Sequence, residues 1–181
     1  TSANMNANEV IANRAIEILG GRKGDYRIVH PNDDVNLCQS TNDVFPTAGK
    51  MTVLQLLPEL IAELEKLELA LADKAKEFAG VIKMGRTQMQ DAVPTTLGRT
   101  FQAYQSFVKR DIRHLMSAAE EMKSLNLGGT AIGNAINATP EYLENITAFV
   151  SAEVGIAFTQ AEDLFDATQN VDGFVRVSAA I

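Results

Sequence analysis

Neutral hydrogen-bonding side chains gather in three short segments of an otherwise acidic chain, at residues 1–4, 40–43 and 85–88. A hydroxyl or amide placed just before a helix acts together with the free backbone N–H groups of the first helical turn, and together they favour a bound carboxylate. The same residue types also cap helices without binding any ligand. The Ser-Thr-Asn-Asp segment at residues 40–43 is therefore predicted either to bind a carboxylate or to cap a helix.

The sequence offers little for nucleophilic catalysis. It contains two histidines, His30 and His114, and neither stands beside a serine or cysteine motif of the kind that forms a catalytic triad. Three basic residues between positions 109 and 113 precede His114, which is typical of a solvated helix face. Cys38 has no predicted basic neighbour to stabilise a thiolate, so we expect it to be a structural residue rather than a reactive one.

Metal binding is weakly indicated. His30, Asp33 and Asp34 are ligand types that bind divalent ions, but no second histidine follows at helical spacing and the loop lacks the calcium-hand pattern. A single cysteine also excludes a zinc site built from clustered cysteines. We therefore predict no metal site.

Long helices are the elements that must position these segments. Apolar residues recur at spacings of three and four, with charged residues covering the rest of each helix surface. A helix is expected to begin near residue 43, where Asn42 and Asp43 are good N-cap residues, and Pro58 is expected to kink or divide it. The pattern predicts helices at residues 4–19, 43–57, 57–78, 101–122, 140–154 and 162–181.

Polar or glycine-rich segments separate these helices. Residues 22–42 are expected to form a loop with at most one short helical turn. Residues 80–93 are longer than a turn between antiparallel helices requires, which indicates a functional loop. Three glycines within residues 127–133 predict a tight, close-packed turn. With no alternating strand runs of any length, the sequence predicts an all-α bundle of long helices.

Composition narrows the class of protein. The net charge of −7 and a pI near 4.8 argue against a nucleic-acid-binding surface, and no apolar run is long enough to cross a membrane. The chain has one cysteine and no N-terminal targeting segment of basic residues followed by an apolar run, so we expect it in the cytoplasm.

The chain starts at Thr1 rather than methionine and stops at Ile181 within an apolar pattern, so we expect it to be cut at both ends. Apolar stripes at residues 57–78 and 101–122 can cover each other only partly, which predicts self-association.

Four strings resemble the aspartase/fumarase superfamily, in order and across the whole chain. They are TSANMNANEVIANRA at residues 1–15, HPNDDVNLCQSTND at 30–43, KMGRTQMQDAVP at 83–94 and NLGGTAIG at 126–133. The resemblance implies a homotetramer whose central domains pool long helices into one bundle, with each active site assembled from three subunits. Members eliminate ammonia, water or an amine to release fumarate, and they need no cofactor.

The resemblance also divides the chain and assigns its site. Residues 1–42 match the C-terminal end of an N-terminal domain, and residues 43–181 match the first part of a central helical-bundle domain. Substrate contacts fall on Thr1, Ser40, Thr41, Asn42, Thr87 and Gln88. The first three match binders of the substrate carboxylate beside the carbon that loses its proton, and the others match residues around the leaving amino group.

A secondary dicarboxylate-binding stretch described for fumarases matches His30, Asn32 and Asp33, although ordering of the loop explains these residues as well. The family's catalytic base is the serine of a loop of the form GSSxMPxKxNP. No such string occurs in this sequence, so the base serine is expected beyond Ile181. No catalytic residue is therefore assigned within residues 1–181, and this chain alone is expected to be inactive.

Gln88 bears on which branch of the superfamily the chain resembles. Fumarases generally carry histidine at the matching position, where it can relay protons for a departing hydroxide, whereas a neutral amide suffices to orient a leaving ammonium. The segment at residues 162–168 also resembles the ammonia-releasing members, while Asn134-Ala135 departs from the usual Thr-Gly. There are two alternatives: a water-releasing member of the superfamily, or a chain that, as isolated, is only a helical oligomerisation module.

Overall fold

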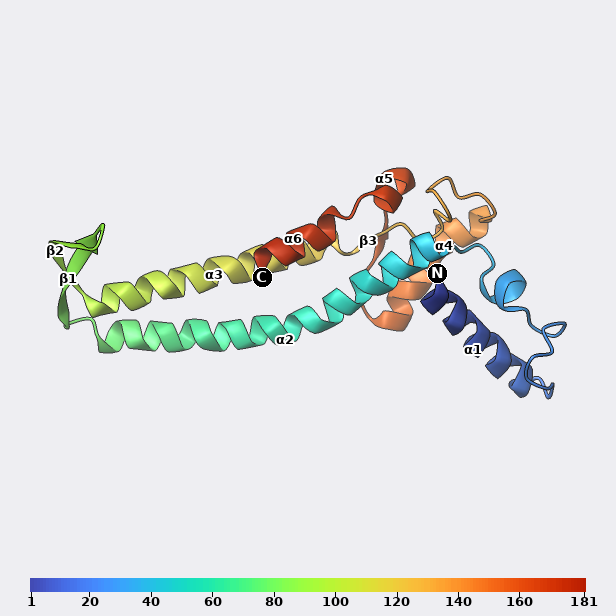
Figure 1. Cartoon of the computed structure of the whole chain (residues 1–181), viewed down its shortest axis with the longest axis horizontal. Coiled ribbons are helices and arrows are strands. Elements are labelled where there is room, and N and C mark those ends of the chain that lie inside the picture. Colours follow the sequence, from blue (N-terminus) through green and yellow to red (C-terminus); the bar gives the residue numbers. More distant parts are fainter. The chain divides into compact units, whose positions relative to one another are not determined.

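The computed structural model describes residues 1–181, most of which form α-helices (Figure 1), and it confirms the predicted all-α class. The helices are α1 Ser2–Ile18, α2 Thr41–Glu77, α3 Leu97–Glu121, α4 Pro140–Val154, α5 Leu164–Gln169 and α6 Asp172–Ala180, with a π-helical turn, η1, at Pro31–Val35. The strands are β1 Ile82–Thr87, β2 Gln90–Thr96, β3 Ser124–Leu125 and β4 Thr159–Gln160. Two compact units result: residues 1–52 with 122–172, and residues 53–121 with 173–181.

The predicted division of the helix at Pro58 is wrong, because α2 is one continuous helix of 37 residues. Proline removes one backbone hydrogen bond from a helix interior. Leu54 and Leu57, just before it, are buried, and burying a leucine side chain is worth roughly 1.5–3 kcal/mol. An interior proline typically costs about 3 kcal/mol from the lost hydrogen bond and the ring clash together, so two buried leucines on this face suffice to offset it.

Residues 80–93, expected to be a loop, instead contribute to an antiparallel β-hairpin of β1 and β2. Thr87 pairs with Gln90, and the register shifts between Gly85 and Arg86. Nearly all hairpin residues are exposed, so no buried face imposes the alternation by which a strand is recognised in a sequence. The predicted absence of strands was therefore wrong here.

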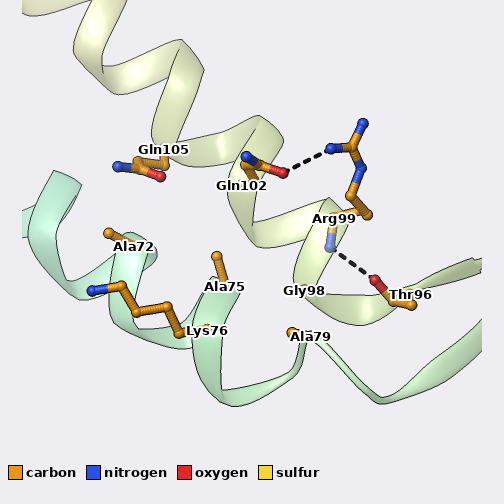
Figure 2. A pocket seen from close by; sticks show the side chains of 9 residues that line it. All are labelled: Ala72, Ala75, Lys76, Ala79, Thr96, Gly98, Arg99, Gln102 and Gln105. Atoms are coloured by element: carbon orange, nitrogen blue, oxygen red, sulfur yellow. Dashed lines mark hydrogen bonds between the residues drawn. The ribbon is translucent and has the colours of Figure 1, made fainter.

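In the second unit, small residues let the end of α2 and the start of α3 approach closely. Figure 2 shows Ala75 of α2, and Ala79 in the turn that follows α2, beside Gly98 at the start of α3. The Gly98 N–H donates to the Phe78 carbonyl at 2.9 Å, and the Phe78 and Phe101 rings lie 5.4 Å apart between centroids. The first turn of α3 is thus anchored on the end of α2.

In the first unit, the glycine-rich turn is buried, as the sequence predicts. Leu125 and Asn126 are fully buried, and Leu127 and Thr130 nearly so. The two-residue strands β3 and β4 pair in parallel beside it, with Ser124 opposite Thr159. Lys50 of α2 donates to the Ser124 carbonyl at 2.6 Å and fixes the start of β3.

The other predicted helix positions agree with the structure except at the C-terminal end. Helices α1 and α4 occupy the predicted segments, and η1 is the single helical turn expected within residues 22–42. Residues 162–181, expected to be one helix, form α5 and α6 instead. Asn170 adopts an extended conformation, with φ −104° and ψ 144°, and that ends α5.

Ile181 was predicted to lie in that helix, but α6 ends one residue earlier, at Ala180. The Ile181 N–H still donates to the Val177 carbonyl at 3.2 Å, so the backbone keeps one helical hydrogen bond past the assigned end. The Ile181 side chain is exposed, whereas Val177 is buried. The apolar pattern that suggested a helix through residue 181 is therefore only partly covered within this chain.

None of the helices combines the length and the apolar character that a membrane span requires.

We expect Gly98→Ala to destabilise the second unit. A Cβ at this position would lie 2.5 Å from the Ala75 carbonyl oxygen and 2.8 Å from Ala79 Cα, both backbone atoms. Overpacking of this kind typically costs about 1–3 kcal/mol. Gly80→Ala is the matched control, because a Cβ there meets nothing within 4 Å. Thermal unfolding measures both, and an equal Tm for the two variants would contradict the close packing.

Candidate functional site

A pocket of about 710 Å³ opens in the first unit at the N-terminus of α2. It is lined by Thr1, Thr41, Asn42, Phe45, Pro46, Ala131, Ile132, Phe165, Thr168, Gln169 and Val171. One part of this lining is hydroxyl and amide groups, and the rest is apolar. The pocket therefore offers hydrogen bonds without a charged side chain of its own.

Three of the predicted substrate-binding residues, Thr1, Thr41 and Asn42, line this pocket. The Thr41 hydroxyl accepts a hydrogen bond from Asn4 Nδ2 at 3.2 Å, and Asn4 is buried in α1. Asn42 Nδ2 donates to the Ala131 carbonyl at 2.7 Å. The structure thus brings these residues together and holds two of them by side-chain hydrogen bonds.

Ser40 precedes α2, and its hydroxyl accepts a hydrogen bond from the Asn42 N–H at 3.2 Å. This is the helix cap that the sequence left open as an alternative. Capping occupies an acceptor position of the hydroxyl oxygen and leaves its hydrogen available to donate. The cap and the predicted carboxylate contact are therefore compatible.

Asp43 links the start of α2 to the glycine-rich turn. Its carboxylate is fully buried and accepts hydrogen bonds from the N–H groups of Ser40, Gly128 and Thr130, at 2.9, 3.2 and 2.8 Å. Burial raises the pKa of Asp43, and these backbone hydrogen bonds oppose that rise. The sequence suggested only a capping role for Asp43 and missed its reach to residues 128 and 130.

Asn126 provides a second link and was also missed. It is fully buried, and its Nδ2 lies 3.1 Å from the Asn42 carbonyl oxygen and 3.1 Å from Thr168 Oγ1. The one available signal was a polar residue between Leu125 and Leu127, since a buried amide needs hydrogen-bond partners. Asn126 therefore ties the first turn of α2 to α5.

Thr87 and Gln88 belong to the β-hairpin of the second unit and are not among the residues that line the pocket. Gln88 and Met89 form the two-residue turn, both with left-handed backbone, at φ 48° and 59°. Such hairpin turns favour asparagine and glycine, so glutamine and methionine here adopt an uncommon conformation. Met89 is 92% exposed at this tip. Gln88 thus lies at the tip of the hairpin, in a two-residue turn with left-handed backbone.

His30, Asn32 and Asp33 come together at η1. His30 Nδ1 accepts from the backbone N–H groups of Asn32 and Asp33, each at 3.2 Å, and the His30 N–H donates to Asp34 Oδ2 at 2.6 Å. His30 Nδ1 also lies 3.3 Å from Asp33 Oδ2, so this ring nitrogen contacts groups of its own turn. These bonds give the loop-ordering explanation a structural basis, while the secondary binding site stays a prediction.

Other candidate chemistry gains no support. No group of three or more histidine, cysteine, aspartate or glutamate side chains is placed to hold a metal ion. Cys38 is buried, in line with a structural role. A further cleft of about 490 Å³ in the second unit is drawn in Figure 2. It is lined by residues of α2, the turn after it, the end of β2 and the start of α3, and it contains none of the predicted site residues.

The catalytic base has no counterpart among the described residues. The resemblance to the superfamily assigns the base to a serine of a loop whose motif does not occur in residues 1–181. The pocket at the start of α2 supplies hydrogen-bond donors for a carboxylate, but no ionisable side chain lines it. Proton abstraction by a serine beyond Ile181 therefore stays a prediction.

Comparison with known proteins identifies the family. A family model described as lyase matches residues 1–181, and the chain belongs to this family. Aspartate ammonia-lyases from Helicobacter pylori and Bacillus subtilis are 50% and 47% identical to it over 181 residues. Each match covers all of this chain but only 39% and 38% of the relative, so the chain spans well under half the length of these proteins.

Solved structures agree with this assignment. A structure described as fumarate lyase:delta crystallin from Brucella melitensis bound to cobalt superposes with a TM-score of 0.93 at 47% identity, over 99% of this chain and 39% of that one. A class II fumarase from Schistosoma mansoni gives a TM-score of 0.90 at 32% identity, over 99% of this chain and 41% of that one. The resemblance to the aspartase/fumarase superfamily is confirmed.

Removing the Asp43 carboxylate should destabilise the first unit strongly. We expect Asp43→Ala to lower the free energy of unfolding by at least roughly 3 kcal/mol, because a buried donor left unpaired costs about 1–3 kcal/mol. Asp43→Asn keeps one acceptor oxygen and should cost less. Urea denaturation measures both variants, and an alanine variant as stable as wild type would contradict the linking role.

The pH dependence has a definite sign. Because the pKa of Asp43 is raised by folding, the folded state holds this proton more tightly than the unfolded state. The resulting stabilisation is complete below the ordinary aspartate range and is lost as pH rises through the raised pKa. The stability advantage of wild type over Asp43→Asn should therefore shrink with rising pH across that window. An advantage that grows with pH would contradict the raised pKa.

Proposed function

We propose that this chain is a segment of an aspartate ammonia-lyase, which reversibly eliminates ammonia from L-aspartate to give fumarate. The identity to enzymes of that name supports the proposal. In this interpretation residues 1–42 end an N-terminal domain, and residues 43–181 begin the central helical-bundle domain. The enzyme acts as a cytoplasmic homotetramer on a small dicarboxylate.

The observation that carries the proposal is the pocket at the start of α2. Thr1, Thr41 and Asn42 line it, and the N-terminal end of a long helix carries partial positive charge that favours a carboxylate. Thr41 and Ser40 each accept a hydrogen bond from a neighbouring group, so each has its hydroxyl hydrogen available for substrate. The pocket is therefore suited to an anion bound by neutral donors.

These donors suit the chemistry of the elimination. Removing a proton beside a carboxylate converts that group into a doubly charged aci-carboxylate. Hydroxyl groups held in place stabilise this growing charge more than they stabilise the ground state, which lowers the barrier. We assign Thr1, Ser40 and Thr41 to this carboxylate. The residues assigned to the leaving amino group are Asn42, Thr87 and Gln88.

The remaining parts of the active site come from elsewhere in the protein. The proton-abstracting serine is expected beyond Ile181 in a GSSxMPxKxNP loop, a string that this sequence does not contain. Thr87 and Gln88 lie in a different compact unit from the pocket, and we propose that a second subunit supplies them. The reaction needs no cofactor. His30, Asn32 and Asp33 are retained as a proposed secondary dicarboxylate site.

A fumarate hydratase of the same superfamily is the second candidate, favoured by the likeness to the Schistosoma mansoni fumarase. Gln88 argues against it, because an amide cannot supply the proton that a departing hydroxide needs. A third interpretation makes the chain a helical oligomerisation module. A tetrameric mass without any lyase activity in the full-length protein would favour that one.

The choice of substrate is directly testable. We expect the full-length protein that contains this chain to convert L-aspartate to fumarate and ammonia, with little or no conversion of L-malate. Fumarate absorbance follows both reactions. Malate turnover that exceeds aspartate turnover would favour the hydratase instead. In the same assay the isolated 181-residue chain should release no fumarate, because it lacks the serine loop.

Thr41→Ala in the full-length protein should reduce kcat more than it weakens substrate affinity, since its hydrogen bond is proposed to strengthen as negative charge grows. Loss of one such donor is typically worth about 3 kcal/mol, or on the order of a hundredfold in rate. Thr52→Ala is the control, because Thr52 is exposed on α2 and its hydroxyl donates to the Ala48 carbonyl. An effect confined to KM would mean that Thr41 binds substrate and transition state equally.

A further inference from the structure

We infer that Thr168 is a further substrate-binding residue, whose hydroxyl donates a hydrogen bond to a carboxylate oxygen of the dicarboxylate. This inference rests on the proposed function. It starts from the buried amide of Asn126, which lies between the first turn of α2 and the hydroxyl of Thr168. Thr168 lines the same pocket as Thr1, Thr41 and Asn42.

The orientation of the Asn126 amide follows from its partners. One of them is the Asn42 carbonyl oxygen, 3.1 Å away, and a backbone carbonyl can only accept hydrogen bonds. The amide nitrogen, not the amide oxygen, must therefore face Asn42. Asn126 is fully buried, so the alternative orientation would place two acceptors against each other away from water.

That orientation decides what the Thr168 hydroxyl does. The same Nδ2 group lies 3.1 Å from Thr168 Oγ1, so the hydroxyl oxygen accepts this hydrogen bond. Its own hydrogen must then point away from Asn126. No protein group accepts it, and Thr168 is only half buried. The hydroxyl is therefore held as a donor on the wall of the pocket.

The arrangement of Thr41 supports this assignment independently of Thr168. The Thr41 hydroxyl also accepts from a buried asparagine, Asn4, and also lines the pocket. Two threonines in one pocket are thus each fixed by an amide on the protein side. A carboxylate only accepts hydrogen bonds, so a pair of hydroxyls with their hydrogens free matches its chemistry.

Gly129 keeps the space beside this hydroxyl open. A Cβ at position 129 would lie 3.3 Å from Thr168 Oγ1 and 3.0 Å from the Asn126 carbonyl oxygen. A side chain here would therefore contact both Thr168 and the Asn126 backbone. Any side chain at position 129 would crowd the Thr168 hydroxyl, and glycine leaves that hydroxyl free to meet a ligand.

The test uses Thr168→Val and Thr168→Ser in the full-length protein. Valine has nearly the shape of threonine without the hydroxyl, and serine retains the hydroxyl. Two quantities are measured: the binding of succinate, an unreactive dicarboxylate, by calorimetry, and KM and kcat for L-aspartate. Thr52→Val is the control, since it removes an exposed hydroxyl of α2 away from the pocket.

We expect Thr168→Val to weaken succinate binding and to lower kcat/KM by roughly tenfold or more, since a hydrogen bond to a charged group is among the stronger ones. Thr168→Ser should remain within about threefold of wild type, and Thr52→Val should match wild type. Succinate binding by Thr168→Val that equals wild type would overturn the inference. Equal losses in the valine and serine variants would also overturn it, because they would indicate packing rather than hydrogen bonding.

Failure of the proposed function gives a different result. A wild-type protein that binds succinate but turns over neither aspartate nor malate would refute the proposed lyase activity, while the succinate arms would still test Thr168. A wild-type protein that does not bind succinate would refute both. If wild type has lyase activity and Thr168→Val binds succinate as tightly as wild type, only the role of Thr168 is refuted.

Discussion

The buried carboxylate of Asp43 is the constraint on which the candidate site depends. A carboxylate without water must be stabilised by donors, and here the backbone N–H groups of Ser40, Gly128 and Thr130 supply them. Those donors lie on two segments more than 80 residues apart in the sequence. Satisfying one charge therefore holds the start of α2 against the glycine-rich turn, and the pocket forms beside that junction.

Buried asparagines position side chains of the pocket, as Asp43 positions the backbone segments beside it. Asn126 links the Asn42 carbonyl to Thr168, and Asn4 links α1 to Thr41. In a low-dielectric interior these hydrogen bonds are stronger than in water, and their geometry is less easily exchanged. The hydroxyls of Thr41 and Thr168 are consequently oriented before any ligand arrives, so binding does not have to order them. This rigidity suits a site that must favour a short-lived, highly charged intermediate over its substrate.

The β-hairpin of the second unit is also constrained, but by backbone strain rather than by burial. Gln88 and Met89 both adopt left-handed conformations that glycine or asparagine would adopt more easily. Residues held in unfavourable conformations concentrate at functional sites, where the orientation of a side chain matters more than local stability. The strain is consistent with the role proposed for Gln88, and Met89 extends the exposed tip beyond it.

Helix positions could be predicted from the sequence because the apolar stripe of a helix repeats every three to four residues, a local property that each segment carries by itself. The candidate residues at 1, 40–42 and 87–88 were likewise found in local strings. The hairpin was not, because its exposed faces impose no alternation. The prediction of a break at Pro58 was wrong because side-chain packing offsets the cost of a proline inside the helix. The partners of Asp43, Asn126 and Thr168 were decided only by the tertiary structure. The pairing of donors and acceptors that lie far apart in the chain depends on how the segments pack. Residue types alone therefore do not predict these hydrogen bonds.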